Sequence, residues 1–316
     1  MDSNQQIEKK PRILVLGSTG RTGKAVVADL EQMLDTVQVV YSSRNREQVE
    51  AWRREGKDAV YLDLDKPQTF SGALVGIDRL FLATGYTVAM VHQSKNIVDA
   101  AADAGVQFIV HLGIFGNGRM TDPHFAWHEM VERYIEGSSV AWAHLHPHFF
   151  MDNLLTTTPV IDGKFFWFMG DQPVGWIAPE DLAAVAAQVL AQGPKQHAGK
   201  QYWLSTEVMN GAEAAAEIAA GLGQPVHDVV LTPADLIAQV DAGAIQFHPT
   251  IEANYAASML EWVRQTYDGL LNFGGATTTC EDLTGRKPLT LRRWVAKNRD
   301  AVLAASGSAT NSTGVA

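Results

Sequence analysis

Three glycines spaced three residues apart, Gly17, Gly20 and Gly23, lie between an apolar run at 13–16 and a segment whose apolar residues have helical spacing. Glycines let the backbone turn tightly and approach a pyrophosphate, and the N-terminus of the following helix offers free N–H groups to it. Strand, glycine triplet and helix together predict a dinucleotide-binding turn; a plain glycine-rich turn is the alternative. The residues expected to bind the dinucleotide here are Gly17, Thr19, Gly20, Arg21, Thr22 and Gly23.

The end of the second predicted strand, 37–41, decides which nicotinamide dinucleotide fits. An NAD site usually has an acidic residue there, which binds the ribose hydroxyls and repels a 2′-phosphate. This sequence has Ser43 and Arg44 instead, followed by Arg46. Hydroxyl and guanidinium groups suit a phosphate, so we expect NADP(H), with NADPH preferred over NADH. Solvated arginines at the start of a surface helix are the alternative.

Two groups of histidines are spaced so that their side chains share a face. His124 and His128 lie four residues apart in a predicted helix. With a pKa near ~6.5, His128 could hold the cofactor ribose or exchange a proton with a substrate; a structural hydrogen bond is the alternative. Alternation along a strand would also put His144, His146 and His148 on one face, but Pro147 is expected to end the strand. A structural role facing the cleft is expected for them. Neither group has the carboxylate or thiolate partners typical of a metal site, so no metal is expected.

Aromatic residues are dense in the second half of the chain. Such density beside a cofactor cleft suits a flat apolar or aromatic substrate held by stacking, although some of these rings must be ordinary core. Tyr86 could stack on the substrate or donate a proton; packing at a helix start is the alternative. The residues expected to contact the substrate are Tyr86, Phe149, Phe150, Trp167 and Trp176.

Alternating strands and helices must position these residues. The predicted strands of the first half are 13–16, 37–41, 59–62, 79–83, 108–112 and 140–145. The helical segments between them are 24–34, 46–54, 68–74, 88–104 and 124–136. Strands that alternate with crossover helices predict an α/β fold with a Rossmann-like, doubly wound parallel sheet.

After about Phe150 the pattern changes to short strands and alanine-rich helices. The predicted strands are 165–168, 174–177, 201–204 and 226–231, and the predicted helices are 181–190 and 212–220. This indicates a smaller α+β domain interleaved with the sheet. The expected organisation is a disordered start at 1–10, a dinucleotide-binding domain at 11–155, a substrate-binding cap at 156–305 and a disordered tail at 306–316.

Composition excludes several other classes. A net charge of −10 argues against a nucleic-acid-binding surface. A single cysteine, Cys280, can form neither an internal disulfide nor a thiolate metal site. The sequence has no long apolar span and no signal peptide, so we expect a cytoplasmic protein without a membrane partner. A homo-oligomer is compatible with these observations.

Several segments together resemble the NmrA-like family of atypical short-chain dehydrogenase/reductases, from about Arg12 to Leu303. The resemblance lies in Gly17-Ser18-Thr19-Gly20-Arg21-Thr22-Gly23, Asp63-Leu64-Asp65, Asn96-Ile97-Val98-Asp99-Ala100-Ala101, Ala104-Gly105-Val106, His124-Phe125, Phe150-Met151-Asp152-Asn153, Pro179-Glu180-Asp181-Leu182-Ala183 and Leu283-Thr284-Gly285-Arg286-Lys287-Pro288. It implies a Rossmann-like domain, a small C-terminal domain and a cleft between them. It also implies that Asp63 contacts the adenine and that Thr84 and Gly85 border the pyrophosphate and nicotinamide ribose.

The sequence departs from the wider superfamily at the acid–base residues. Conventional members use a serine and a Tyr-x-x-x-Lys pair, but the corresponding positions here are Gly113, His124 and His128. Relatives often keep a lysine where this chain has His128. The loss favours an NADPH-dependent oxidoreductase whose acceptor carries its own electron sink, such as a quinone, azo compound, dye or enone, with His128 and Tyr86 as candidate catalytic residues. The alternative is a non-catalytic NADP(H)-sensing regulator that acts through a protein partner.

Overall fold

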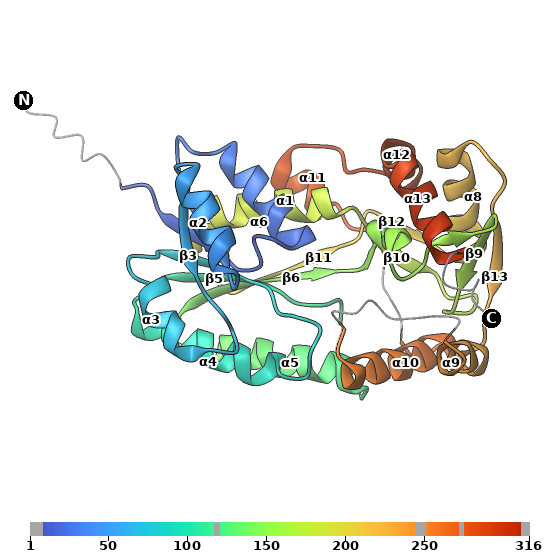
Figure 1. Cartoon of the computed structure of the whole chain (residues 1–316), viewed down its shortest axis with the longest axis horizontal. Helices are drawn as coiled ribbons and strands as arrows, with labels where there is room; N and C mark the ends of the chain where they lie inside the picture. The colour runs from blue at the N-terminus through green and yellow to red at the C-terminus, as the bar shows by residue number, and fades with distance from the viewer. Residues whose placement is uncertain (1–8, 117–120, 244–250, 272–274, 311–316) are drawn as a thin grey trace, which may run out of the picture.

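The structure is a computed structural model that describes residues 9–116, 121–243, 251–271 and 275–310. A seven-stranded, all-parallel sheet forms its centre (Figure 1). The order of the strands reverses between β1 and β4, which is where open α/β sheets bind their ligands. Across the sheet the strands are β11 (Lys200–Leu204), β6 (Ala141–Pro147), β5 (Phe108–Leu112), β4 (Arg79–Leu82), β1 (Arg12–Val15), β2 (Gln38–Ser43) and β3 (Asp58–Tyr61).

Helices cover both faces of this sheet (Figure 1). Because both faces are covered, the strands are apolar without alternation, and Ile13, Leu14 and Val15 are all fully buried. One face carries α1 (Arg21–Glu31), α2 (Arg46–Arg54) and α6 (Pro179–Gln192), with α11 (Thr279–Thr284) against α6. The other face carries η1 (Pro67–Thr69), α3 (Phe70–Ala73), α4 (Met90–Asp103) and α5 (Pro123–Glu136).

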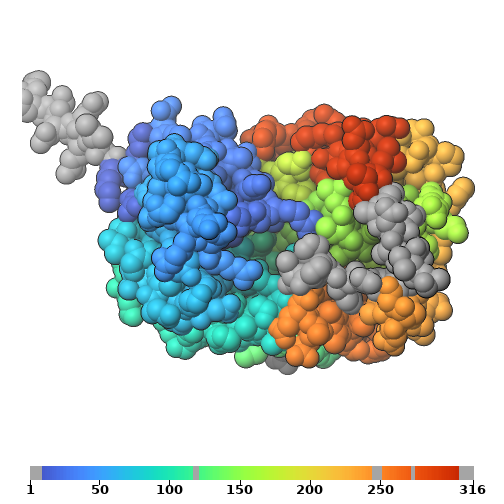
Figure 2. Space-filling model, viewed as in Figure 1, coloured from blue at the N-terminus to red at the C-terminus, as the bar shows by residue number. Residues whose placement is uncertain are grey.

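A second, smaller unit follows β6 and lies beside the sheet; the early (blue) and late (orange to red) parts of the chain occupy opposite sides of Figure 2. Its two small sheets have the orders β12-β10-β7 and β13-β9-β8. The strands are β7 (Phe149–Phe150), β8 (Val160–Ile161), β9 (Lys164–Trp167), β10 (Val174–Ile177), β12 (Glu207–Met209) and β13 (His227–Val230). The helices are η2 (Met151–Leu155), α8 (Gly211–Leu222), α9 (Pro233–Asp241), α10 (Ala253–Tyr267), α12 (Leu291–Lys297) and α13 (Arg299–Thr310).

The structure confirms the predicted fold class. The chain returns from the second unit to the sheet through α6, the short α7 (Pro194–His197) and β11, so the two units are interleaved. Helix α13 continues to Thr310, into the tail expected to be disordered from 306, because the preceding Ala-Val-Leu-Ala-Ala run favours helix. Residues 1–8 and 311–316 of the expected disordered ends lie outside the described residues. Among the described helices, none has the length and apolar character that a membrane span requires.

Candidate functional site

The glycine turn follows β1 and leads into α1. Gly17 has a φ of +70°, which favours glycine, and its carbonyl accepts a hydrogen bond from the Gly20 N–H at 2.8 Å. A Cβ on Gly23 would lie 2.1 Å from the Gly17 oxygen, so the turn and helix meet too closely for any side chain there. A Cβ on Gly20 would lie 3.3 Å from the same oxygen and is nearly tolerated. The backbone geometry of the turn therefore requires glycine at positions 17 and 23. Gly20 has no side chain that would cover the N-terminus of α1.

The N-terminus of α1 is open to an anion. No side chain in the described part of the chain caps it, and Thr19, Gly20 and Arg21 are exposed, while Thr22 is partly buried. Uncapped N–H groups and the positive end of the helix dipole suit a phosphate. The structure therefore brings together all six residues that the sequence assigned to this turn.

The edge formed by the ends of β2 and β3 carries several positive charges. Arg44 is exposed, the Arg46 guanidinium lies 3.8 Å from the centre of the Tyr61 ring, and Lys66 Nζ lies 2.8 Å from Asp63 Oδ2. Burial opposes ionisation of Asp63, but Lys66, the Asp65 N–H and Arg44 together hold its pKa below the usual value. Ser43 is buried, and its hydroxyl accepts a hydrogen bond from the Asn45 N–H. This edge therefore carries a surplus of cations, which suits a phosphate group.

An ion pair joins the glycine turn to the second unit. Arg21 Nη1 lies 2.8 Å from Asp152 Oδ2 of η2 and 3.3 Å from the Asp152 carbonyl oxygen. Burial raises the pKa of Asp152, and the guanidinium acts against that shift. Tyr86, 48% exposed, follows partly buried Thr84 and exposed Gly85 beyond the end of β4. The ion pair fixes the position of η2 relative to the turn at the open edge of the sheet.

Tyr255 of α10 lies between the two helical histidines. Its hydroxyl is 2.8 Å from His124 Nε2 and 3.4 Å from His128 Nε2, and all three side chains are at least nine-tenths buried. Burial lowers the pKa of His124 to about 4, lowers the pKa of His128 well below 6.5 and raises the pKa of Tyr255. All three groups are therefore neutral near pH 7. The Tyr86 ring meets the Tyr255 ring edge-on, with centroids 5.8 Å apart.

The N-terminus of α10 is anchored to the segment after β4. Glu252 Oε2 accepts hydrogen bonds from the Thr87 hydroxyl at 2.6 Å and from the Val88 N–H at 2.9 Å. The Glu252 N–H donates to the Tyr86 carbonyl at 2.9 Å. These bonds hold Tyr255 beside Tyr86. Tyr255 was not predicted from the sequence, because its histidine partners lie 127 and 131 positions away and no local pattern marks it.

Gly113, which the sequence analysis aligned with the conventional serine, directly follows β5. A Cβ on Gly113 would lie 2.5 Å from the Glu132 carboxylate of α5. A serine would therefore displace Glu132, whose pKa is raised to about 8 by burial, by Glu136 and by Glu129 despite nearby Arg133. The Glu132 carboxylate therefore occupies the space that a side chain at position 113 would need.

The pKa of Glu132 gives a stability prediction. The pKa of Glu132 is higher in the folded protein than in the unfolded chain. The free energy of unfolding therefore falls as pH rises from about 4.5 to 8. Glu132→Gln should therefore stabilise the protein at pH 8.5 by on the order of 4 kcal/mol, and by much less at pH 5. Urea unfolding at both pH values measures the difference. Glu50→Gln on α2, where the side chain is 59% exposed, is the matched control. Its effect on the free energy of unfolding should be the same at both pH values. An equal effect of Glu132→Gln at both pH values would contradict the conclusion that burial raises the pKa of Glu132.

The strand histidines are engaged inside the protein. His144 Nδ1 lies 3.3 Å from His111 Nδ1, and the His144 ring stacks on Trp142. His146 Nδ1 donates to the Ile114 carbonyl at 2.9 Å, and its ring stacks on Trp203. Burial lowers the pKa of His148 to about 3. Within the described ranges, no histidine, cysteine or carboxylate group is arranged to hold a metal ion.

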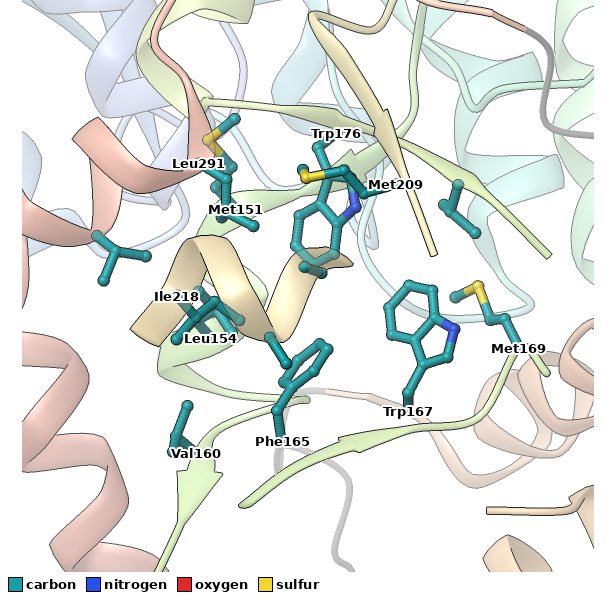
Figure 3. Packing of buried hydrophobic residues seen from close by; sticks show 14 of the residues in the cluster. Met151, Leu154, Val160, Phe165, Trp167, Met169, Trp176, Met209, Ile218 and Leu291 are labelled. Carbon is teal, nitrogen blue, oxygen red and sulfur yellow. The ribbon is translucent and has the colours of Figure 1, made fainter. Parts of the chain in front are cut away.

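The expected aromatic substrate contacts divide into two groups. Trp167 and Trp176 are fully buried, and their rings stack with centroids 5.9 Å apart in the core of the second unit (Figure 3). The expectation that these two tryptophans contact a substrate is therefore corrected, because both point into the core that their sheets enclose. Phe149 and Phe150 are only partly buried, and Phe149 packs edge-on against both tryptophans.

Comparisons with known proteins identify the family. The family model described as the NmrA-like family matches residues 9–278. An NAD(P)H azoreductase of Xenophilus azovorans is 31% identical over 226 residues, covering 70% of this chain and 77% of that relative. A solved Escherichia coli NADPH-dependent quinone oxidoreductase, complexed with NADPH, has a TM-score of 0.77 at 23% identity and covers 90% of this chain and 98% of its own. NmrA, a negative transcriptional regulator, has a TM-score of 0.75 at 17% identity, with 95% and 98% covered. The chain therefore belongs to the NmrA-like family.

Proposed function

We propose that this chain is an NADPH-dependent reductase that transfers hydride to an aromatic or apolar electrophile of the azo, quinone, dye or enone type. The observation that carries the proposal is the open N-terminus of α1 beside a cationic edge at β2, with Tyr86 close to Arg21 of the glycine turn. The likeness to an azoreductase and to a quinone oxidoreductase supports the same reaction class.

We propose one role in NADPH binding for each group of described residues. Gly17 to Gly23 would hold the pyrophosphate, Ser43 and Arg44 the 2′-phosphate, and Asp63 the adenine. Thr84 and Gly85, at the end of β4, would lie along the nicotinamide ribose. When bound, NADPH supplies a hydride from its nicotinamide ring.

The remaining residues orient the acceptor. Tyr86, Phe149 and Phe150 offer partly exposed aromatic surface for a flat ring system. His128 is buried against Tyr255, and this supports a role that acts through the Tyr255 hydroxyl. An acceptor with its own electron sink needs no charged acid at this site, which fits the neutral state of the two histidines.

The cationic edge predicts the choice of cofactor. Arg44→Glu should weaken NADPH binding by at least about 10-fold, since a charge-assisted phosphate contact contributes about 1.5–3 kcal/mol and is replaced by repulsion. NADH binding should change little, so the preference for NADPH is erased or reversed. Titration calorimetry measures both affinities. Arg54→Glu, at the far end of α2, makes the same charge change and should leave the preference intact. Equal affinities of the unaltered protein for NADPH and NADH would contradict the assignment.

The second candidate is a non-catalytic NADP(H) sensor that acts through a protein partner. The glycine at position 113, in place of the conventional serine, and the likeness to a transcriptional regulator favour it. A sensor needs no acceptor pocket, whereas Tyr86, Phe149 and Phe150 keep aromatic surface exposed. A screen of NADPH oxidation against azo compounds, quinones, cationic dyes and enones separates the two. Turnover of at least one aromatic acceptor is expected, and NADPH binding without any turnover would favour the sensor.

A further inference from the structure

An aromatic residue, Tyr61, lies at the edge of the sheet where Ser43 and Arg44 also lie. Tyr61 is the last residue of β3 and pairs with Ser43, the last residue of β2. Because β2 and β3 are parallel, both strands end at the same edge, where open α/β sheets bind their ligands. Helix α2 packs beside β3 (Figure 1). Tyr61 is therefore a neighbour of the residues to which we assign the 2′-phosphate of NADPH.

The first residue of α2, Arg46, lies on the ring of Tyr61. The guanidinium carbon is 3.8 Å from the centre of the ring, and Arg46 is exposed to solvent. The Asn45 side chain accepts hydrogen bonds from two backbone N–H groups of α2, which fixes the turn from which Arg46 extends. Glu50, one helical turn further on, forms an ion pair with Arg53 instead, at 2.9 Å. Within the described ranges, the Arg46 guanidinium has no carboxylate partner, so its charge is available to an anion.

The other cation close to Tyr61, Lys66, is already matched by a carboxylate. Lys66 Nζ lies 2.8 Å from Asp63 Oδ2. The Tyr61 hydroxyl lies 3.5 Å from each of these two atoms, at the outer limit of a hydrogen bond. The main polar contact of Tyr61 is therefore the one between its ring and Arg46.

A guanidinium that is held by an aromatic ring keeps its N–H donors. The donors lie in the plane of the group, so they can bind a phosphate while the face of the group rests on the ring. An arginine that is ordered before binding also loses less conformational entropy when the ligand arrives. A phosphate at the ends of β2 and β3 would therefore meet two guanidinium groups, those of Arg44 and Arg46, the second already in position.

We propose that Arg46 is a second specificity-determining cation for the 2′-phosphate of NADPH and that Tyr61 is its positioning residue. This inference rests on the cofactor site of the proposed function. NADH carries a hydroxyl where NADPH carries this phosphate, so a contact of Arg46 with the phosphate affects NADPH alone. A contact of Arg46 with the adenine would affect both cofactors. The comparison of NADPH with NADH therefore distinguishes the two contacts.

Arg46→Met tests the cation. It removes the charge of an exposed side chain and keeps an unbranched side chain in α2. The dissociation constant for NADPH should rise by at least about 10-fold, because a charge-assisted contact with the phosphate is lost. The dissociation constant for NADH should stay within about twofold. Titration calorimetry of the full chain measures both, and Arg54→Met, at the other end of α2, is the matched control that should change neither.

Tyr61→Leu tests the ring. It should raise the dissociation constant for NADPH by about 5-fold, because Arg46 is then no longer ordered before binding, and should leave that for NADH within about twofold. Tyr61→Phe keeps the ring and should restore the NADPH affinity to within about twofold of the unaltered protein. In the Arg46→Met background, Tyr61→Leu should have no further effect on NADPH binding, because the ring acts through Arg46.

The outcomes separate this inference from the function on which it rests. Equal weakening of NADPH and NADH binding by Arg46→Met, or weakening of neither, would overturn the role of Arg46. The same loss in Tyr61→Phe as in Tyr61→Leu, or an equal loss for both cofactors in Tyr61→Leu, would overturn the positioning role of the ring. Equal affinities of the unaltered protein for NADPH and NADH would overturn the cofactor assignment itself.

Discussion

Gly20→Val is expected to abolish NADPH binding while the protein stays folded. The Cβ of residue 20 has nearly enough room, 3.3 Å from the Gly17 oxygen, so the backbone can keep its course. The two valine methyl groups would stand over the uncapped N-terminus of α1, where the pyrophosphate must approach. We expect the dissociation constant to rise by at least about 100-fold, or about 2.8 kcal/mol. Fluorescence titration with NADPH measures it.

Gly72→Val is the matched control for this substitution. Gly72 is an exposed glycine in α3, and a Cβ there meets no described atom within 4 Å. The control should bind NADPH as the unaltered protein does. Retention of NADPH affinity in Gly20→Val would show that the cofactor does not approach α1 at this turn and would remove the basis of the proposed function.

His128→Ala is expected to lower kcat for an azo acceptor by at least about 10-fold. The His128 side chain faces the Tyr255 hydroxyl at 3.4 Å, so its loss removes one of the two imidazoles that contact this hydroxyl. Steady-state kinetics at saturating NADPH measure the effect. His92→Ala on α4 removes an exposed histidine and is the matched control.

His128→Lys distinguishes two roles of the same position. If residue 128 holds the nicotinamide ribose, lysine should keep substantial activity, as the family resemblance implies. If it passes protons, lysine should fail near neutral pH, because an amine with a pKa near ~10.4 exchanges its proton too slowly with neutral partners. Unchanged kinetics in His128→Ala would remove the residue from both roles and leave Tyr86 as the remaining candidate.

The parts of the fold that depend on local sequence were predictable. The strand, the glycine turn and α1 are encoded within about twenty adjacent residues, and β5 and α2 begin and end where their patterns predict. The fold class followed from the alternation of such segments. Asn45, which caps α2 by accepting two backbone hydrogen bonds, shows how closely local chemistry fixes these boundaries.

The candidate site was only partly predictable, because much of it is assembled by distant contacts. Tyr255 reaches the histidines from a helix that the sequence analysis did not identify. The ion pair of Arg21 with Asp152 joins residues 131 positions apart. Conversely, Trp167 and Trp176 are residues of a type common in sites for aromatic substrates, but both are packed in the core. Only the three-dimensional arrangement distinguishes a core tryptophan from one that contacts a substrate.

The late return of the chain to the sheet has a consequence for biosynthesis. The edge strand β11 pairs with β6, and α6 packs against α1, yet both are made after the β7–β10 segment of the second unit. A nascent chain emerging from the ribosome therefore exposes the outer edge of β6 and one flank of α1 until Leu204 has been translated. Unpaired edges of this kind attract other strands. The order of synthesis thus leaves the growing polypeptide open to pairing with other strands at this edge until β11 is added.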